Sequence, residues 1–172
     1  MSQTTAPAAL PEDAKYAERQ DPVIRFDLPG GSIYCVLFPD AAPKHVERML
    51  MLAAEGFYNG VRFHRIVPNF VAQIGDPKSR AGVDQPGVGS GGSKYGNLPL
   101  EVNRAYKNVR GSLAMARTND PHSANSQFYI VLKDAPHLDM QYTVFGQVQG
   151  EGMAIVDKLK VGDPIQMFIV KR

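Results

Sequence analysis

The sequence predicts a mainly β protein in which one antiparallel sheet closes into a barrel with helices over its ends. Short runs of β-branched and aromatic residues outnumber the helical patterns, and glycine or proline separates one run from the next. Most connections between these runs are too short to hold a helical crossover, which favours antiparallel neighbours. A closed barrel leaves no exposed edge strands and gives each helix a surface to pack against.

The length of 172 residues fits one folded domain with an N-terminal extension. Apolar residues make up 44% of the chain and charged residues 21%, both close to the average of globular proteins. Residues 1–21 contain Ala, Pro, Thr and scattered charges with little apolar periodicity, so we expect a flexible N-terminal arm there. The folded domain is expected over residues 22–172.

Charge, cysteine content and hydropathy argue against several classes of protein. A net charge of +2 is too small for a general nucleic-acid binder. Cys35 is the only cysteine, which excludes an intramolecular disulfide and fits a reducing compartment. No apolar stretch approaches the roughly 18 residues that span a bilayer, and the first residues lack a secretory signal pattern. We therefore expect a cytoplasmic monomer with no nucleic-acid or membrane partner.

A hairpin and a helix are the first elements that the sequence predicts. Residues 23–26 and 33–38 are strand-like runs on either side of a turn rich in glycine. Asp40 and Pro43 then open a helix, with Asp40 as its cap and Pro43 in the first turn, where a missing N–H does no harm. Apolar residues recur at helical spacing, and Gly56 stands where a C-terminal stop belongs.

The rest of the chain alternates between strand-like runs and one further helical pattern. That helical pattern covers residues 150–160, in which four apolar residues recur at helical spacing. The remaining predicted strands cover residues 61–67, 70–74, 111–116, 128–132, 143–148 and 165–170.

Two other patterns receive ordinary structural explanations. Residues 87–92 match the glycine-rich fingerprint of dinucleotide-binding proteins, but glycine and proline follow where a helix should begin, so we expect a surface loop. The four histidines lack a short metal-ligand spacing, so we expect hydrogen-bonded or solvent-facing rings and no metal. These histidines are His45, His64, His122 and His137. No nucleophile elbow occurs, although a Ser-His-Asp triad assembled from distant residues stays open.

Residues 63–76 differ from the other strands because a charged Arg65 stands among strand-forming apolar residues, close to Phe70. From the residues alone, a structural salt bridge or an exposed strand arginine is the more common explanation. Together with residues 111–117 and 125–130, however, this segment resembles the cyclophilins, which are peptidyl-prolyl cis/trans isomerases. The resemblance extends over about residues 22–171 and includes the runs 55–60 and 142–148.

The resemblance implies a closed eight-stranded antiparallel β-barrel capped by two α-helices, with the substrate groove on its outer surface. It also implies an isomerase that accelerates X-Pro rotation in peptides and in unfolded or folding proteins, without a cofactor. Arg65 matches the catalytic arginine, Gln73 the polar residue that supports it, and Phe70 the floor of the proline pocket. The other positions that match the substrate groove are Val71, Ala116, Arg117, Gln127, Tyr129, His137, Leu138 and Tyr142.

Several groove residues depart from the family pattern. Val71 replaces the usual methionine, Arg117 the common asparagine, and Tyr129 a phenylalanine. His137 stands in place of the tryptophan typical of cyclosporin-sensitive eukaryotic members, and Tyr142 in place of a histidine. The pattern is similar to that of bacterial cyclophilins, and we expect weak cyclosporin binding.

Two alternatives to an isomerase remain open. The altered rim is compatible with a proline-peptide binding or chaperone module whose isomerase activity is incidental. A metal-dependent hydrolase that uses His122 and His137 is a weaker alternative.

Overall fold

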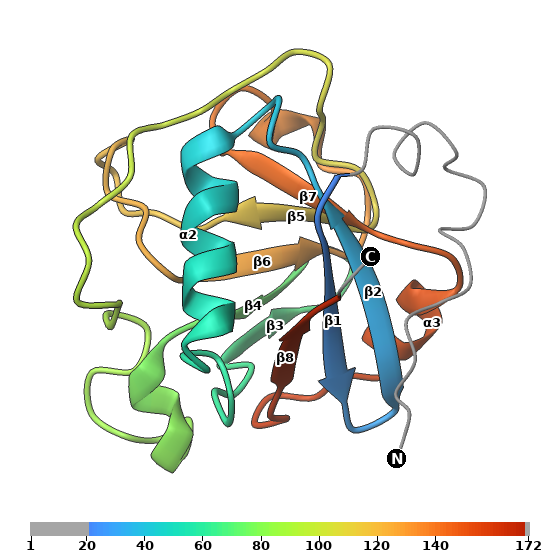
Figure 1. Cartoon of the computed structure of the whole chain (residues 1–172). Coiled ribbons are helices and arrows are strands. Elements are labelled where there is room, and N and C mark those ends of the chain that lie inside the picture. The colour runs from blue at the N-terminus through green and yellow to red at the C-terminus, as the bar shows by residue number, and fades with distance from the viewer. Residues whose placement is uncertain (1–20, 171–172) are drawn as a thin grey trace.

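The computed structural model describes residues 21–170, so the predicted N-terminal arm lies outside the described residues except for Asp21. Eight antiparallel strands form one sheet, and two α-helices accompany it (Figure 1). The helices are α2 (Pro43–Ala54) and α3 (Gly152–Val156), with short 3₁₀ helices at Pro77–Ala81 and Pro136–Leu138. The strands are β1 (Val23–Leu28), β2 (Gly31–Leu37), β3 (Arg65–Val67), β4 (Val71–Ile74), β5 (Ser112–Met115), β6 (Phe128–Val131), β7 (Val144–Val148) and β8 (Gln166–Ile169).

The sheet is an open half-barrel, so the prediction of a closed barrel is wrong. Its strand order is β3-β4-β6-β5-β7-β2-β1-β8, which leaves β3 and β8 as edges. These edge strands are only three and four residues long. The segments that precede them meet in an isolated bridge between Arg62 and Pro164. Because proline has no N–H to donate, a regular ladder cannot continue through this bridge.

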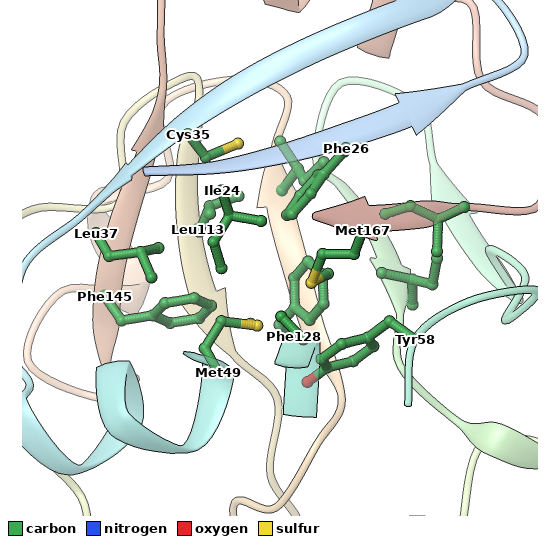
Figure 2. Close-up of a cluster of buried hydrophobic side chains, with 14 of the residues drawn as sticks. Ile24, Phe26, Cys35, Leu37, Met49, Tyr58, Leu113, Phe128, Phe145 and Met167 are labelled. Atoms are coloured by element: carbon green, nitrogen blue, oxygen red, sulfur yellow. The ribbon is translucent and has the colours of Figure 1, made fainter. Parts of the chain in front are cut away.

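The main hydrophobic core lies between the inner face of the sheet and α2 (Figure 2). Phe128 on β6 is fully buried at its centre. Its ring centroid lies 5.8 Å from that of Phe26, 5.5 Å from Tyr58 and 6.1 Å from Phe145. Such tilted and edge-on contacts add to the free energy gained by burying aromatic surface. The core therefore fixes β6, whose neighbouring residues on the opposite face line the site described below.

The start of α2 differs from the prediction. Asp40 does not cap the helix, because the N-cap residue is Ala42, which makes no side-chain cap hydrogen bond. The carboxylate of Glu101 instead accepts hydrogen bonds from the backbone N–H groups of Lys44 (3.1 Å) and His45 (2.9 Å). A carboxylate from a distant loop thus satisfies two N–H groups that the helix leaves unpaired.

The other predicted boundaries of the first helix agree with the structure, whereas the second helix is shorter than predicted. Pro43 begins α2 as expected, and Gly56 has the positive φ of 75° that suits a residue beyond a helix C-terminus. The second helix is shorter than residues 150–160, since α3 ends at Val156. No helix within residues 21–170 is long and apolar enough to cross a membrane.

Two histidines are held neutral by burial. His45 is buried, and its Nδ1 lies 2.6 Å from Oε1 of Glu101. Burial lowers the pKa of His45 and of His64 below the ordinary value of 6.5, although Glu101 and Asp76 act in the opposite direction. His45 Nε2 and His64 Nδ1 have no hydrogen-bond partner among the described residues. Protonation would therefore bury an unpaired N–H in each ring.

We expect Phe128→Ala to lower the free energy of unfolding by about 3 to 5 kcal/mol, because it removes a fully buried ring and leaves a cavity. Chemical denaturation at neutral pH measures this loss. Val161→Ala is the control, since Val161 is 52% exposed, and we expect it to change stability by less than about 0.5 kcal/mol. Equal losses in the two variants would contradict the assigned core.

The neutral histidines predict that the protein loses stability in mild acid. Their lowered pKa values mean that the unfolded chain binds more protons than the folded chain below pH 6.5. This stabilisation is therefore complete above about pH 6.5 and is lost as pH falls toward the lowered values. Denaturant titrations at pH 7.5 and pH 5.5 measure the loss, which His64→Gln should reduce and His122→Gln, at an exposed position, should not. An unchanged loss in His64→Gln would contradict the contribution of His64.

Candidate active site

A pocket of about 190 Å³ opens on the face of the sheet opposite the main core. Alternation along the strands separates the two faces: Ala72 and Phe128 belong to the core, whereas Val71 and Tyr129 belong to a second buried cluster beneath the pocket. Nine of the eleven predicted site residues line this pocket. They are Arg65, Phe70, Val71, Gln73, Ala116, Arg117, Tyr129, Leu138 and Tyr142.

Arg65 and Gln73 form a directly opposed pair across β3 and β4. Directly opposed residues place their side chains on the same face of the sheet, and the Arg65 Nη1 donates to the Gln73 Oε1 at 3.2 Å. Arg65 is exposed, and no acidic side chain within residues 21–170 forms a salt bridge with it. Its remaining N–H groups can therefore serve a ligand in the pocket.

A chain of amide hydrogen bonds fixes the orientation of Gln73. Gln73 Nε2 donates to Gln127 Oε1 at 3.0 Å. Gln127 Nε2 in turn donates to the backbone carbonyls of Gly89 (3.0 Å) and Gly91 (2.9 Å). Because Gln127 uses its N–H₂ on these carbonyls, it presents its oxygen to Gln73, and Gln73 presents its own oxygen to Arg65. Gln127 thus lines an adjoining hollow rather than this pocket.

The glycine-rich segment 87–92 forms a loop with no helix after it, as predicted. Asp76 anchors this loop by accepting hydrogen bonds from the N–H groups of Gly89 (2.5 Å) and Gly91 (3.0 Å). A third bond comes from the N–H of Lys78 at 2.9 Å. Burial opposes ionisation of Asp76, but these N–H groups outweigh it and lower the pKa. A buried carboxylate therefore holds the carbonyls on which Gln127 depends.

Phe70 is positioned by the tight turn between β3 and β4. Asn69 in this turn has a φ of 60°, a left-handed conformation that asparagine tolerates better than most residues. The N–H of Phe70 donates to the carbonyl of Val67 at 3.0 Å, and its carbonyl accepts from Leu132 at 2.8 Å. His137 stacks on Phe70 with ring centroids 5.7 Å apart and an interplanar angle of 22°. His137 thus supports Phe70 and does not line the pocket.

Tyr129 closes the buried end of the pocket, and its hydroxyl forms a hydrogen bond within the protein. This hydroxyl donates to the Asn108 Oδ1 at 3.2 Å, while the Asp139 carboxylate accepts from the backbone N–H and from the side-chain Nδ2 of Asn108. Burial raises the pKa of Tyr129, so the hydroxyl stays protonated as a donor. Tyr129 has one oxygen more than the phenylalanine usual in the family, and that oxygen has its hydrogen-bond partner within the fold.

Arg117 and Tyr142 form one rim of the pocket. The Arg117 guanidinium carbon lies 4.5 Å above the Tyr142 ring, and Tyr142 packs edge-on against Tyr129 with centroids 6.0 Å apart. Arg117 also donates to the carbonyls of Gln141, at 3.0 Å and 2.8 Å, and of Thr118, at 2.9 Å. These contacts fix the Arg117 side chain in the pocket wall. Arg65, by contrast, has a single side-chain hydrogen bond among the described residues.

A larger hollow of about 400 Å³ adjoins the first and shares Gln73, Ala116 and Arg117 with it. Its other lining residues come mainly from segments 89–93 and 123–127, and they are small and polar. Because they share Gln73, Ala116 and Arg117, the two hollows form one continuous groove.

Sequence reasoning missed two anchors of this site, Asp76 and Asn108. Both are buried polar residues whose partners lie in distant segments. The Asp-Pro step after the glycine at position 75 indicated a turn, but nothing in the local pattern linked it to the glycine-rich loop. The sequence around Asn108 contains no pattern that indicated a role in the site.

The histidines proposed for a metal-dependent hydrolase have other contacts. His137 stacks on Phe70, and His122 Nδ1 accepts from the N–H of Leu100 at 3.1 Å. Within residues 21–170, no group of three or more His, Cys, Asp or Glu side chains is placed to hold a metal ion.

The pocket is suited to binding a small apolar ring beside a polar edge. The described residues that line it include no serine, cysteine, threonine or carboxylate, and so they offer none of the usual nucleophiles and bases of covalent catalysis. Its distinctive feature is the Arg65 guanidinium, whose N–H groups are not all used within the protein, next to the Phe70 ring. Such a site acts by stabilising one conformation of a ligand over another.

Comparison with known proteins gives one consistent result. The family model of the cyclophilin type peptidyl-prolyl cis-trans isomerases matches residues 23–170. A probable peptidyl-prolyl cis-trans isomerase of Brucella suis is 45% identical over 170 residues, which are 97% of this chain and 81% of the relative. A peptidyl-prolyl cis-trans isomerase of Helicobacter pylori is 40% identical over 141 residues, covering 81% of this chain and 80% of that one.

The solved structures agree with the sequences. A cyclophilin type peptidyl-prolyl cis-trans isomerase of Cryptosporidium parvum has a TM-score of 0.74 at 28% identity, and the match covers 88% of this chain and 99% of the other. The fold, the matched residues and the named relatives support one conclusion. The chain belongs to the cyclophilin-type peptidyl-prolyl cis-trans isomerases, and it is an enzyme that catalyses cis/trans isomerisation of X-Pro peptide bonds.

Proposed function

We propose that Arg65 is the catalytic residue and that it acts on the prolyl nitrogen while the X-Pro bond is twisted. Resonance opposes this rotation with a barrier of roughly 18 to 20 kcal/mol, whereas the cis and trans forms differ by only about 0.5 to 1 kcal/mol. At the top of the barrier the nitrogen becomes pyramidal and regains a lone pair. A donor placed at that nitrogen therefore binds the transition state better than either planar form.

The position of Arg65 carries this proposal. Its guanidinium lines the pocket and has one side-chain hydrogen-bond partner among the described residues, Gln73. Arginine remains charged at any working pH and holds its donors in a rigid plane. The Gln73 and Gln127 chain fixes that plane without neutralising the charge, because both partners are neutral amides.

Phe70, Leu138 and Tyr129 would hold the pyrrolidine ring of the substrate. All three line the same pocket of about 190 Å³, which suits one ring rather than a longer side chain. Stacking of His137 on Phe70 and the bond from Tyr129 to Asn108 keep two of these walls fixed. With the ring held, the peptide that precedes the proline is the part that rotates.

The energy required is within reach of these contacts. An acceleration of 10⁵ needs about 6.8 kcal/mol, since each tenfold step corresponds to 1.36 kcal/mol. Removing one donor to a developing charge typically costs about 2.7 to 4 kcal/mol in enzymes. Arg65 would therefore supply about half, and preferential binding of the twisted peptide would supply the rest.

We propose peptides and unfolded or folding proteins as substrates. A related Cryptosporidium parvum structure was determined in the presence of the dipeptide Ala-Pro, which supports a proline-containing ligand here. The open groove formed by the two hollows also supports extended chains, and with them a role in protein folding or as a chaperone. The buried, unpaired Cys35 needs no oxidising compartment and so supports a cytoplasmic location.

We expect Arg65→Ala to lower kcat/KM for a proline peptide by about 10²- to 10³-fold, because it removes the donor to the prolyl nitrogen. Arg65→Lys should retain part of the activity, because it keeps the charge but loses the planar donors. Protease-free NMR exchange on a labelled peptide measures these rates. Arg104→Ala is the matched control, because Arg104 is exposed on a loop outside both hollows, and its activity should equal that of the wild type.

The same spectra separate an isomerase from a binding module. They give the dissociation rate and the isomerisation rate of one peptide on one protein. For an isomerase, the bound peptide isomerises about as fast as it dissociates, and Arg65→Ala slows isomerisation while it leaves affinity nearly unchanged. If the bound peptide isomerised far more slowly than it dissociated in the wild type, the binding-module alternative would stand.

We also expect cyclosporin to bind weakly and His137→Trp to bind it at least about tenfold more tightly. The imidazole is smaller and more polar than an indole, and a tenfold gain needs only about 1.4 kcal/mol from added apolar contact. Titration calorimetry measures both affinities. An unchanged affinity in His137→Trp would show that this position does not limit cyclosporin binding.

A further inference from the structure

Arg117 stands at the boundary between the two hollows of the groove and lines both of them. Its side chain is half-buried, and its position over the Tyr142 ring holds it in place. A guanidinium has five N–H groups. Three of those of Arg117 donate to backbone carbonyls, two to Gln141 and one to Thr118. The other two have no hydrogen-bond partner among the described residues, and a ligand can use them.

The charge of Arg117 has no counter-ion in the described part of the chain. No acidic side chain within residues 21–170 forms a salt bridge with it. The described residues that line the two hollows include no Asp or Glu. Two carboxylates in neighbouring segments bind backbone groups instead: Asp76 accepts from the glycine loop, and Asp120 accepts from the N–H of His122 at 2.9 Å.

Two further cations lie along the same groove. Arg65 lines the smaller hollow. The Nζ of Lys78 donates at 3.3 Å to the Oγ of Ser90, which lines the larger hollow. A cleft that carries charge of one sign attracts ligands of the opposite sign. The groove therefore favours a negatively charged peptide over a neutral peptide of the same shape.

The position of Arg65 gives the direction in which a bound peptide leaves the proline pocket. In the proposed function, Arg65 faces the prolyl nitrogen, which is the atom bonded to the preceding residue. Gln73 accepts from Arg65 and lines both hollows. The pocket edge at the prolyl nitrogen is therefore the edge shared with the larger hollow, and the residues that precede the proline extend across it.

The side chain that enters the larger hollow belongs to the second residue before the proline. The residue directly before the proline lies on the shared edge, because its carbonyl carbon is part of the bond that rotates. The next residue lies one step of about 3.3 to 3.6 Å farther along the chain. Among the described residues that line the larger hollow, Arg117 is the charged one, and the others are small or polar. A carboxylate in this hollow would form charge-assisted hydrogen bonds with Arg117.

We propose that Arg117 is a specificity-determining residue, and that it selects substrates with a glutamate or aspartate two residues before the proline. This inference rests on the proposed function, because the direction of the peptide follows from the role of Arg65. The substrate carboxylate supplies the counter-ion that the described part of the protein lacks. Its planar pair of oxygens also matches the planar donors of a guanidinium.

The test measures kcat/KM by protease-free NMR exchange on three peptides with blocked termini. They are Ala-Glu-Ala-Pro-Ala, Ala-Gln-Ala-Pro-Ala and Ala-Lys-Ala-Pro-Ala. At low salt we expect the glutamate peptide to exceed the glutamine peptide about fivefold, as for an ion pair in a partly solvated site. The lysine peptide should give the lowest value. In 1 M salt the three values should converge, because salt screens the charges.

Substitutions of Arg117 show whether this residue carries the preference. Arg117→Asn should bring the ratio of the glutamate to the glutamine peptide close to one, and Arg117→Lys should keep part of it, because it keeps the charge. Arg117→Glu should make the lysine peptide the best of the three. A general loss of activity cancels in these ratios. Arg104→Asn is the matched control, because Arg104 is exposed outside both hollows, and it should keep the wild-type ratio.

Each other outcome overturns the inference in a recognisable way. Equal values for the glutamate and glutamine peptides, with both isomerised rapidly, would refute the selection and leave the proposed function intact. An undiminished preference in Arg117→Asn would refute the role of Arg117. An equal gain from a glutamate placed two residues after the proline would refute the proposed direction of the peptide. Failure to isomerise any of the peptides would refute the proposed function together with this inference.

Discussion

The hydrogen bond between Arg65 and Gln73 is the interaction on which the site depends. It exists because β3 and β4 pair in a register that sets these two residues directly opposite each other. That register follows from the tight turn at Asn69, which also positions Phe70. One short hairpin at the edge of the sheet therefore places the cation, its support and the pocket floor together.

The support of Arg65 extends well beyond its first partner. Gln73 is held by Gln127, Gln127 by two glycine carbonyls, and the glycine loop by the carboxylate of Asp76. Within this series of hydrogen-bonded residues, Asp76 and Arg65 carry the charges. The Asp76 carboxylate accepts hydrogen bonds from backbone N–H groups rather than from the arginine. The charge of Arg65 thus stays available for the substrate, while its position is set by neutral groups.

Much of the fold could be predicted from the sequence because its signals are local: strand runs, the Pro43 start and the Gly56 stop of α2 follow from spacing and backbone preferences. The groove residues follow instead from the resemblance to the cyclophilins, since the residues alone favour an ordinary structural role for Arg65. The open seam could not be predicted, because it depends on how Pro164 meets Arg62, which lies in a segment far away in the sequence. The cap from Glu101 and the tether from Asn108 to Tyr129 also join segments far apart in the chain. Such contacts leave no periodic pattern.

Chemical rescue of Arg65→Ala tests the central claim most directly. A guanidinium ion fits the space that the lost side chain leaves, and it carries the same charge and planar donors. We predict that guanidinium at concentrations too low to unfold the protein restores isomerisation in a saturable way, and that ammonium at equal ionic strength restores much less. No rescue, or equal rescue by ammonium or sodium, would contradict a planar cationic donor at the prolyl nitrogen.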